Sequence, residues 1–441
     1  MRLINYLRKI ISYDNPIRIL WHKLKGLTAA IVNGFPARKM VVIGVTGTNG
    51  KTTTSHMIEH ILRTSGKKVA MISTVALSIN GKSKANKSKK TTLSPFLTQK
   101  FLRNCVKKGV EYVVIEASSH ALHQSRLLGI PFAIAVLTNI THEHLDYHGT
   151  MKRYARTKKI LFNIAARTCK QKEAEVAKNI PHQHGLVLNS SDRFYQEFIE
   201  IDCPTKISYG FGEGDLQAQA VTYSKYGSKF AIRYQRDQIG VELKVPGGFN
   251  IENALAATGA ALNCKLSLED IKHGLENFEG VPGRMERISS PLGFEVVVDF
   301  ALTPDALNKL YKTLRETTPN KLIGIIGSCG DRDKKKRPDM GSIVAEHTDI
   351  TIVTDEEPYS EDPMQIMQAV LEGAKKIKKL KKDLHLIEDR YEAIEFAVKN
   401  ASEGDIIVVT GMGNFTTRNM NKGPIAWDER EVVREIISKH S

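Results

Sequence analysis

A glycine-rich run that ends in lysine and threonines is the strongest chemical signal in the sequence. It comprises Gly47, Thr48, Asn49, Gly50, Lys51, Thr52 and Thr53, and it follows a strand-like apolar run at 40–45 and precedes a helical pattern. Glycines let the backbone approach phosphate oxygens, and a helix N-terminus supplies unpaired amides and partial positive charge. Only two residues separate the glycines, rather than the usual four. Even so, Lys51 can reach outer phosphates and a threonine hydroxyl can ligate Mg²⁺, so the run predicts a nucleotide site.

Candidate metal ligands follow two neighbouring predicted strands. Glu116 ends the strand-like run at 112–116, and His144 lies in a histidine-rich run, 139–148, after the next strand. The carboxyl ends of parallel strands face the ligand crevice of an α/β sheet. Mg²⁺ prefers carboxylate, water and phosphate oxygens, whereas histidines alone would suggest zinc. A hydrogen-bonded loop without metal is the alternative for the histidine-rich run.

The elements that must position these residues alternate between strands and helices. Strands are predicted at 40–45, 68–73, 112–116 and 131–139, with helices between them. This alternation predicts an α/β fold with a mainly parallel sheet. The basic stretch 82–90 predicts a loop. Short strands within 205–245 and helices at 250–264 and 267–277 complete this part of the chain.

A second α/β series is predicted beyond a Val-Pro-Gly hinge at 281–283. Its expected strands lie at 295–300, 322–327, 350–354, 384–387 and 405–410. We therefore predict three units, which are a basic helical N-terminal segment (1–39), a nucleotide-binding domain (40–281) and a C-terminal domain (282–441).

The N-terminal segment, 1–39, holds eight basic residues and one acid, with leucine, isoleucine and Trp21 interleaved. Amphipathic helices are predicted at 2–12 and 16–33. A helical cap on the next domain is favoured, because an apolar stripe usually faces a core. Contact with an anionic membrane surface is the alternative.

Composition excludes several classes of protein. The 441 residues are 41% hydrophobic and 25% charged, as in an ordinary folded chain. The net charge of +16 favours an anionic partner. The chain shows neither an apolar run long enough for a membrane helix nor a signal peptide, and its five cysteines form no CxxC pair, so we expect a cytoplasmic protein. Nucleic acid is the least favoured partner, because aromatics do not interleave with the basic residues.

The motifs taken together resemble the Mur ligases, ATP-dependent amide-bond enzymes of peptidoglycan precursor synthesis, and among them the MurE type. The resemblance runs from about residue 40 to the C-terminus and is specific in order and spacing. Besides the glycine-rich run, its motifs are Thr91-Thr92, 116–122, 144–150, 246–253, 283–286, 299–305, 330–334 and 361–363. It implies a central P-loop ATPase domain followed by a Rossmann-like domain, and the cofactors ATP and Mg²⁺.

The resemblance also implies roles for individual residues. The glycine-rich run would hold the ATP phosphates, and the metal positions would be Thr52, Glu116, His144 and Lys158, the last matching a lysine that the family carbamylates. Further ATP contacts would be Asn250 and Asn253 on the adenine side, Arg284 at the phosphates and Asp299 at the ribose. A muramyl-peptide substrate would meet Thr91, Thr92, Ser118 and Arg126. The reaction would be amide formation through an acyl phosphate, catalysed by Lys51, Glu116, His144 and Lys158 in a monomer.

Three departures from the MurE pattern stand out. About 40 residues precede the P-loop motif and its strand, where the family carries a uridine-nucleotide domain of about 100 residues, so we expect that this domain is missing or rebuilt. The Asp-Asn-Pro-Arg of diaminopimelate-adding enzymes is replaced by Glu356, Glu357, Pro358 and Tyr359, and Phe415 stands where the family has a glutamate. The glutamates favour a free amino acid with a cationic side chain, such as lysine or ornithine. Alternatives for the whole chain are a folylpolyglutamate-type ligase and a non-catalytic ATP-binding partner subunit.

Overall fold

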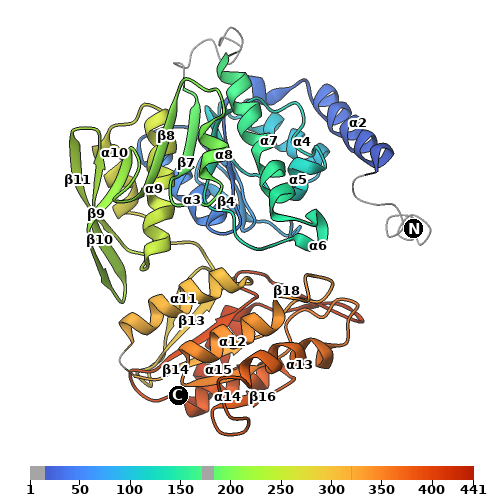
Figure 1. Ribbon diagram of the computed structural model, residues 1–441, viewed down its shortest axis with the longest axis vertical. Coiled ribbons are helices and arrows are strands. Elements are labelled where there is room, and N and C mark those ends of the chain that lie inside the picture. The colour runs from blue at the N-terminus through green and yellow to red at the C-terminus, as the bar shows by residue number, and fades with distance from the viewer. Residues whose placement is uncertain (1–14, 171–182, 319) are drawn as a thin grey trace.

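Two β-sheets, one above the other in Figure 1, organise the chain. The computed structural model describes residues 15–170, 183–318 and 320–441. The larger sheet has eleven strands in the order β11-β10-β9-β8-β7-β6-β1-β5-β2-β3-β4. Its parallel centre consists of β1 (Val41–Thr46), β2 (Val69–Ile72), β5 (Tyr112–Glu116), β6 (Phe132–Leu137), β7 (Gly185–Asn189) and β8 (Lys206–Phe211). The predicted α/β class and the four predicted strands of this region are confirmed.

Helices cover both faces of the larger sheet. One face packs against α3 (Lys51–Thr64), α9 (Gly248–Asn263) and α10 (Leu268–Glu276), and the other against α4 (Pro95–Lys107), α5 (Ser119–His123) and α7 (Met151–Lys170). In β1, Val41, Ile43 and Val45 enter the first core, while Val42 enters the second. Burial on both sides explains why the strand is continuously apolar rather than alternating.

The edges of the larger sheet are antiparallel. At one edge, β9 (Leu216–Ser224), β10 (Gly227–Tyr234) and β11 (Asp237–Leu243) follow β8. At the other, β3 (Ala76–Ile79) pairs with β4 (Lys82–Ala85). The prediction of a loop over 82–90 is therefore wrong for its first four residues. All four side chains of β4 are exposed, so backbone pairing alone defines this strand and the sequence lacks an apolar alternation.

The smaller sheet has the order β12-β13-β17-β14-β15-β16. Its strands are β12 (Glu286–Ser289), β13 (Glu295–Asp299), β14 (Leu322–Ile326), β15 (Ile350–Val353), β16 (Leu384–Leu386) and β17 (Ile406–Thr410). One face carries α11 (Pro304–Thr317), α12 (Arg337–His347) and α13 (Pro363–Ala374), and the other carries α14 (Arg390–Asn400) and α15 (Glu429–His440). All five predicted strands are present, and the hairpin of β18 (Thr417–Met420) and β19 (Gly423–Ala426) was not predicted.

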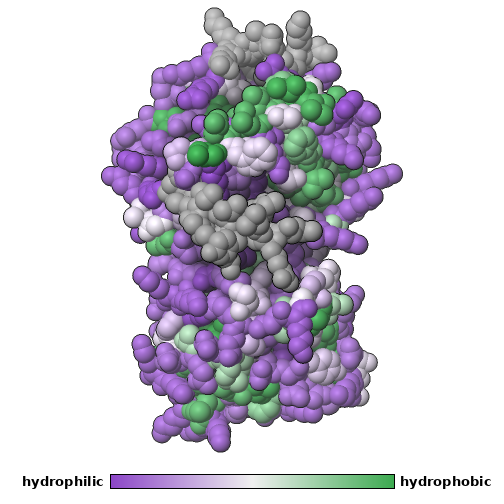
Figure 2. Space-filling view, turned by 90° about the vertical axis from the view of Figure 1, so that its right-hand side faces the viewer, coloured by the Kyte–Doolittle hydropathy of each residue, from purple (hydrophilic) through white to green (hydrophobic). Residues whose placement is uncertain are grey.

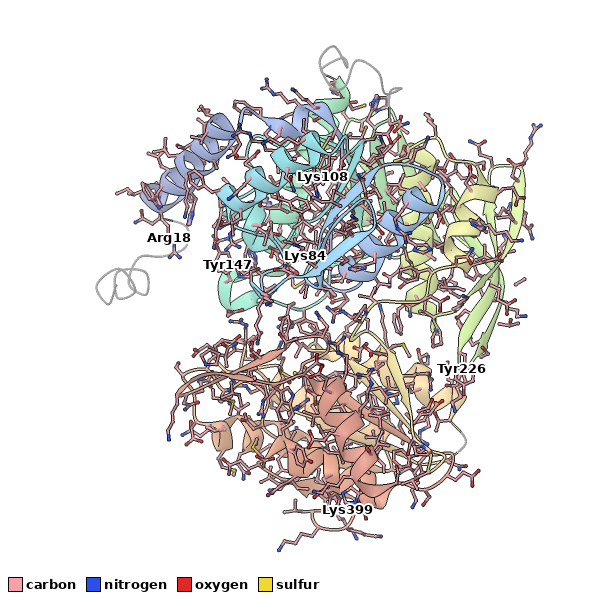
Figure 3. The ribbon with its side chains drawn as sticks, turned by 180° about the vertical axis from the view of Figure 1, so that it is seen from behind. Arg18, Lys84, Lys108, Tyr147, Tyr226 and Lys399 are labelled. Carbon is pink, nitrogen blue, oxygen red and sulfur yellow. The ribbon has the colours of Figure 1, made fainter. Side chains whose placement is uncertain are left out.

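The two bodies contact each other at several points. Figure 3 labels Tyr226 at the tip of the β9–β10 hairpin, beside the smaller sheet, where its hydroxyl donates to Glu295 Oε1 at 3.1 Å. The chain passes between the bodies at the expected hinge, where Gly283 has φ of 69°. A Cβ on Gly283 would lie 2.2 Å from Asn414 N, so only glycine fits this crossing.

The N-terminal helix α2 (Pro16–Asn33) confirms the second helix expected in the N-terminal segment, and its N-cap Asn15 accepts a hydrogen bond from Ile17 N. The helix expected at 2–12 lies outside the described residues. Gly26, Ala29 and Ala30 are the buried residues of α2, whereas its large apolar side chains are exposed. The helix does pack on the next domain, against α4, as the favoured cap requires, but small residues rather than the apolar stripe make the contact. Among the described residues, no helix is long and apolar enough to cross a membrane.

Candidate active site

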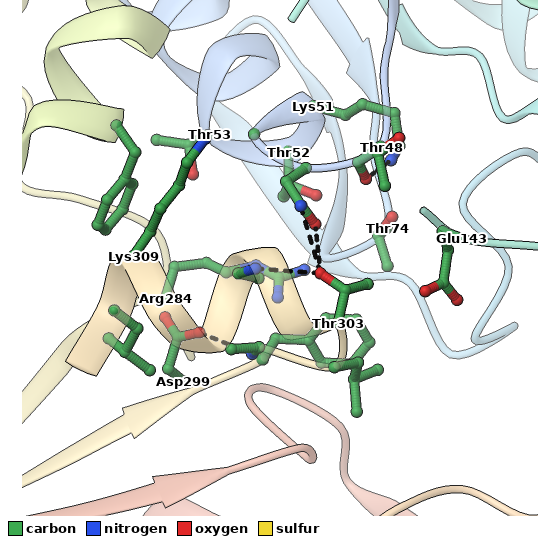
Figure 4. Close-up of a pocket in the computed structure, with 18 of the residues that line it drawn as sticks. Thr48, Lys51, Thr52, Thr53, Thr74, Glu143, Arg284, Asp299, Thr303 and Lys309 are labelled. Carbon is green, nitrogen blue, oxygen red and sulfur yellow. Dashed lines mark hydrogen bonds between the residues drawn. The ribbon is translucent and has the colours of Figure 1, made fainter. Parts of the chain in front are cut away.

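A cavity of about 360 Å³ lies between the two sheets and is lined from both bodies. Figure 4 shows the glycine-rich loop and the start of α3 on one side and Arg284, Asp299 and Thr303 on the other. The glycine-rich loop, the segment that follows β6 and the segment from β13 into α11 therefore converge on one space. Most of the site residues expected from the sequence line this cavity or adjoin it.

The glycine-rich loop forms a cradle at the N-terminus of α3. Gly50 is the N-cap residue with φ of 81°, and within the described residues no side chain caps this helix. A Cβ on Gly47 would lie 1.8 Å from Thr138 Oγ1, so the loop packs against the end of β6. Lys51 Nζ donates to Gly47 O at 3.1 Å and Thr48 O at 2.7 Å. Uncapped amides and a lysine at a helix start fit a bound phosphate chain.

Oxygen ligands gather around Glu116, the last residue of β5. Thr52 Oγ1 donates to Glu116 Oε2 at 3.2 Å, and Thr74 donates to both carboxylate oxygens through its amide and hydroxyl, each at 2.9 Å. Burial raises the pKa of Glu116, while Lys51 and these hydrogen bonds lower it. A carboxylate and a hydroxyl side by side beneath a phosphate cradle fit Mg²⁺, which is held by one or two carboxylates together with substrate phosphates.

Lys158 lies on α7 and is fully buried beneath the glycine-rich loop. Its Nζ donates to Gly47 O at 2.6 Å and lies 4.3 Å from the centre of the Tyr154 ring. Burial and the nearby charge of Lys51 place the pKa of Lys158 well below its usual value. A neutral amine is the form that reacts with CO₂, so this environment suits carbamate formation. Lys158 is thus buried, although a lysine in a basic helix is usually on the surface.

His144 lines the cavity and precedes the short helix α6 (Leu145–His148). Its ring lies 4.6 Å from that of His120, and burial, His120 and Lys158 hold its pKa well below the usual value. The imidazole is therefore neutral, as a metal ligand must be. In His148 the Nε2 atom is already engaged, because it shares a hydrogen bond with Ser119 Oγ at 3.0 Å. In residues 15–170, 183–318 and 320–441, no three His, Cys, Asp or Glu side chains group as a metal site.

Arg284 and Asp299 face the glycine-rich loop from the second body (Figure 4). The Arg284 guanidinium stacks 4.1 Å from the centre of the Phe300 ring, and burial lowers its pKa while Asp299 and Glu116 raise it. Asp299 accepts hydrogen bonds from Met285 N and Ala301 N, each at 2.7 Å. These amides fix the carboxylate at the cavity wall, and each oxygen keeps a further acceptor position.

Asn250 and Asn253 lie at the start of α9 and are buried against the glycine-rich loop. Asn253 Oδ1 accepts from Thr54 Oγ1 at 3.2 Å, and its Nδ2 donates to Asn250 Oδ1 at 3.3 Å. Asn250 Nδ2 donates to Pro246 O at 2.8 Å. The N-cap residue of α9 is Gly247, so neither asparagine caps this helix.

The residues expected to meet the muramyl peptide form one connected group. Thr91 Oγ1 lies within hydrogen-bond distance of Thr74 Oγ1, at 3.0 Å, and Thr92 Oγ1 shares a hydrogen bond with Ser118 Oγ at 3.2 Å. Arg126 Nη1 donates to Thr92 O at 3.3 Å. Thr91 lines the cavity, and the group continues from there to Arg126, which follows the end of α5.

The two glutamates of the altered signature have different surroundings. Glu356 is buried, accepts from the Cys329 thiol at 3.0 Å, and has its pKa raised to about 7 by burial. Glu357 lines the cavity and contacts Lys89 of the first body, with Nζ to Oε1 at 2.6 Å. Tyr359 also lines the cavity, and its hydroxyl accepts from Asn419 Nδ2 at 3.1 Å. Of the two glutamates, only Glu357 is therefore placed to meet a ligand in the cavity directly.

The contacts that join the two bodies across the cavity were not predicted from the sequence. Asn49 Nδ2 donates to Asp305 Oδ2 at 2.9 Å. Lys336 Nζ lies 3.2 Å from Glu143 Oε1 and donates to Leu302 O at 2.8 Å. Glu143 lies within the histidine-rich run, and Lys336 belongs to a lysine run that is typical of a solvated face. Their partners are far apart in the chain, so no local pattern could have indicated these pairs.

Comparisons with known proteins agree over nearly the whole chain. Residues 45–261 match the Mur ligase middle domain, and residues 283–413 match the domain described as "Mur ligase, glutamate ligase domain". The chain is 35% identical over 432 residues to the UDP-N-acetylmuramoyl-L-alanyl-D-glutamate--2,6-diaminopimelate ligase of Geobacillus kaustophilus, covering 97% of this chain and 86% of that one. The protein of that name from Halalkalibacterium halodurans is 37% identical over 407 residues, with coverages of 92% and 80%.

Solved structures give the same result. A structure of a UDP-N-acetylmuramoyl-L-alanyl-D-glutamate--2,6-diaminopimelate ligase superposes with a TM-score of 0.61 at 32% identity and covers 91% of this chain and 79% of its own. Folylpolyglutamate synthase of Mycobacterium tuberculosis, complexed with ADP, gives a TM-score of 0.71 at 18% identity, with coverages of 88% and 91%. At that identity the second likeness concerns the fold alone.

Proposed function

The chain belongs to the Mur ligase family and is an ATP-dependent ligase, and from this premise we propose that it joins a free amino acid to a UDP-linked muramyl dipeptide. One observation carries the proposal. A single cavity contains the phosphate cradle around Lys51, faces the Thr91–Arg126 group and is bordered by Glu357. Nucleotide, carboxylate and amine can therefore meet in one space, as amide formation requires.

The chemistry follows from the charges. A carboxylate is a poor acylating agent, so transfer of the γ-phosphoryl group of ATP to it creates a good leaving group, which the amine then displaces. Bringing two anions together is the electrostatic problem, and Lys51 and Arg284 are placed on opposite sides of the cavity to neutralise them. Mg²⁺, held by Thr52 and Glu116 with the carbamate of Lys158 and with His144, would supply further positive charge at the phosphates.

We place the nucleotide between the two bodies. Asn250 and Asn253 at the start of α9 would contact the adenine, and Asp299 the ribose. The bridge from Asn49 to Asp305 and that from Glu143 to Lys336 would hold the bodies closed around it. Closure keeps water away from the acyl phosphate, which would otherwise hydrolyse.

Phosphate release provides the test of this function. The purified chain, supplied with ATP, Mg²⁺, UDP-N-acetylmuramoyl-L-alanyl-D-glutamate and a mixture of amino acids, should release phosphate and form a tripeptide product. Omission of either the carrier or the amino acids should stop the release of phosphate. Equal release without the carrier would contradict the proposed function.

For the incoming amino acid we propose a cationic side chain. Lys89 supports this, because its ammonium group lies between Glu357 Oε1, the carbonyl of Thr417 and the Phe415 ring, at 2.6 Å, 2.5 Å and 4.7 Å. A carboxylate, a carbonyl and an aromatic face together form a site for an ammonium group. A substrate ammonium would replace that of Lys89 there. Tyr359, in the position of the signature arginine, cannot grip a second carboxylate with two parallel hydrogen bonds.

Competition between lysine, ornithine and meso-diaminopimelate at equal concentration should therefore favour the two basic amino acids. Loss of a bidentate charged contact costs on the order of 2–3 kcal/mol, which is roughly a hundredfold in kcat/KM. Lys89→Ala should lower the KM for lysine by vacating the ammonium site, whereas Lys87→Ala, on the exposed part of the same loop, should leave it unchanged.

A clear preference for meso-diaminopimelate would contradict this proposal. In that case Arg332, whose guanidinium lies 5.4 Å from the centre of the Tyr359 ring, would be the contact for the second carboxylate. Arg332→Ala would then reduce the preference, and this outcome is readily separated from loss of ligase activity, because lysine transfer can be followed in the same variant.

A further inference from the structure

Helix α2 has two opposite faces of different character. At 100° per residue, Gly26, Ala29 and Ala30 share the face that packs on the body. The contact is close, because a Cβ on Gly26 would lie 2.6 Å from Ser125 O, and one on Gly129 would lie 2.7 Å from Ala30 Cβ. Small residues thus hold α2 on the segment that follows α5, and its outward face is free of this packing.

The outward face of α2 carries large apolar side chains. In the part of the chain that the structure describes, 19 large hydrophobic residues are exposed, and seven of them belong to this one helix. Trp21 is 64% exposed, and the stripe also includes Ile17, Leu20, Leu24, Ile31 and Val32. Figure 2, which views the side from which α2 projects, shows hydrophobic surface gathered on the upper body. A large exposed apolar surface of this kind marks an interaction site.

Positive charge flanks the stripe. Lys25 and Arg18 lie on one side of it by helical phase, and Lys23 lies on the other. Helix α4, which packs beside α2, continues the pattern, because Phe96 and Leu97 are exposed at its start. Further along α4 the exposed residues include Lys100, Arg103 and Lys107. Neither helix contains an aspartate or a glutamate.

We propose that α2 lies in the headgroup region of an anionic lipid membrane, with Trp21 and the apolar stripe inserted and the flanking cations at lipid phosphates. An apolar stripe bordered by lysine and arginine is the pattern of an interfacial helix. A second copy of the chain on this face would bring like charges together, which disfavours self-association. Residues 16–33 precede both matched family domains, and none of them lines the cavity between the two bodies.

Vesicle binding by the full chain tests the proposal. Vesicles of phosphatidylcholine with 30% phosphatidylglycerol should bind the chain. Vesicles of phosphatidylcholine alone should bind it at least about tenfold more weakly, because each lysine or arginine near an anionic surface contributes about 1 kcal/mol to binding, and α2 carries more than one. Trp21 emission should shift to the blue on binding. Trp427, which donates to Glu429 in the second body, should contribute an unchanged background, measurable in Trp21→Phe.

Paired variants separate insertion from general attraction. Trp21→Ser with Leu24→Ser should reduce binding at least about tenfold, whereas Leu292→Ser with Ile377→Ser, two exposed apolar residues of the second body, should not. Lys23→Gln with Lys25→Gln should also weaken binding, in contrast to Lys375→Gln with Lys376→Gln. All of these variants should keep the ligase activity and the melting temperature of the wild type.

Three results would overturn the proposal. The first is absence of wild-type binding to anionic vesicles. The second is equal binding by the Trp21→Ser, Leu24→Ser variant, which would assign attraction to the net charge alone. The third is a dimer in solution that this variant converts to a monomer, which would show that a second copy covers the stripe.

Discussion

Turnover should fall by at least about a thousandfold when Lys51 is replaced by methionine. The side chain is half-buried at the start of α3, near Glu116 and opposite Arg284. Methionine keeps most of the volume but removes the charge that offsets repulsion between the γ-phosphate and the attacking carboxylate. Removal of one preorganised hydrogen-bond donor commonly lowers kcat by about 10²–10³. Lys51 also carries a full positive charge, so we expect a loss at the upper end of this range, about 10³ or more.

The measurement for this variant is kcat together with the Kd of a fluorescent ATP analogue. Because the loop amides still hold the phosphates, the loss in kcat should exceed the loss in nucleotide affinity. Lys68→Met, an exposed lysine beyond the end of the same helix, is the control and should behave as the wild type. Turnover within tenfold of wild type in Lys51→Met would remove this lysine from the proposed mechanism.

Lys158→Ala is the second change with a large expected effect. An uncharged amine at Lys158 can form a carbamate, which places a carboxylate-like group beneath the glycine-rich loop. Its loss should lower turnover about a thousandfold, because a metal ligand is removed. Formate or acetate should partly restore activity, since either can enter the space that the deleted side chain leaves.

Two further variants separate chemistry from packing. Lys158→Met fills the space, so it should be as stable as the wild type, as inactive as Lys158→Ala, and insensitive to formate. Lys152→Ala, an exposed residue on the same helix, should retain full activity. With ¹³CO₂ the wild type should show a carbamate carbon signal that both Lys158 variants lack. Full turnover in Lys158→Ala would contradict the assigned role.

Local sequence patterns were sufficient to predict the phosphate cradle and the strand that leads into it. The run from β1 through Gly50 to α3 could be predicted because a buried strand, a tight turn and a helix start each leave a sequence signature within a few residues. Glu116 could be predicted for the same reason, because it ends a continuously apolar strand. Residues such as Lys158 could be identified only from the resemblance to a family, because a lysine on a basic helix carries no local signal of burial.

Contacts between distant segments could not be predicted in the same way. Lys89 and Glu357 are 268 positions apart, and Lys336 and Glu143 are 193 apart, so only the packed bodies bring them together. The strand β4 lacked a signal because all of its side chains face solvent. For α2, the apolar stripe was visible in the sequence, but Gly26 and Ala30, which decide the packing face, looked like ordinary helix positions.

Transfer of ¹⁸O from the reacting carboxylate of the carrier to phosphate tests the central claim most directly. If the carboxylate attacks the γ-phosphorus and the amine then displaces phosphate, one carboxylate oxygen must leave with the phosphate. We predict one ¹⁸O in phosphate for each amide bond formed by the wild-type chain. Phosphate released without label, while the labelled oxygens remain in the amide product or pass to water, would contradict an acyl-phosphate mechanism in this cavity.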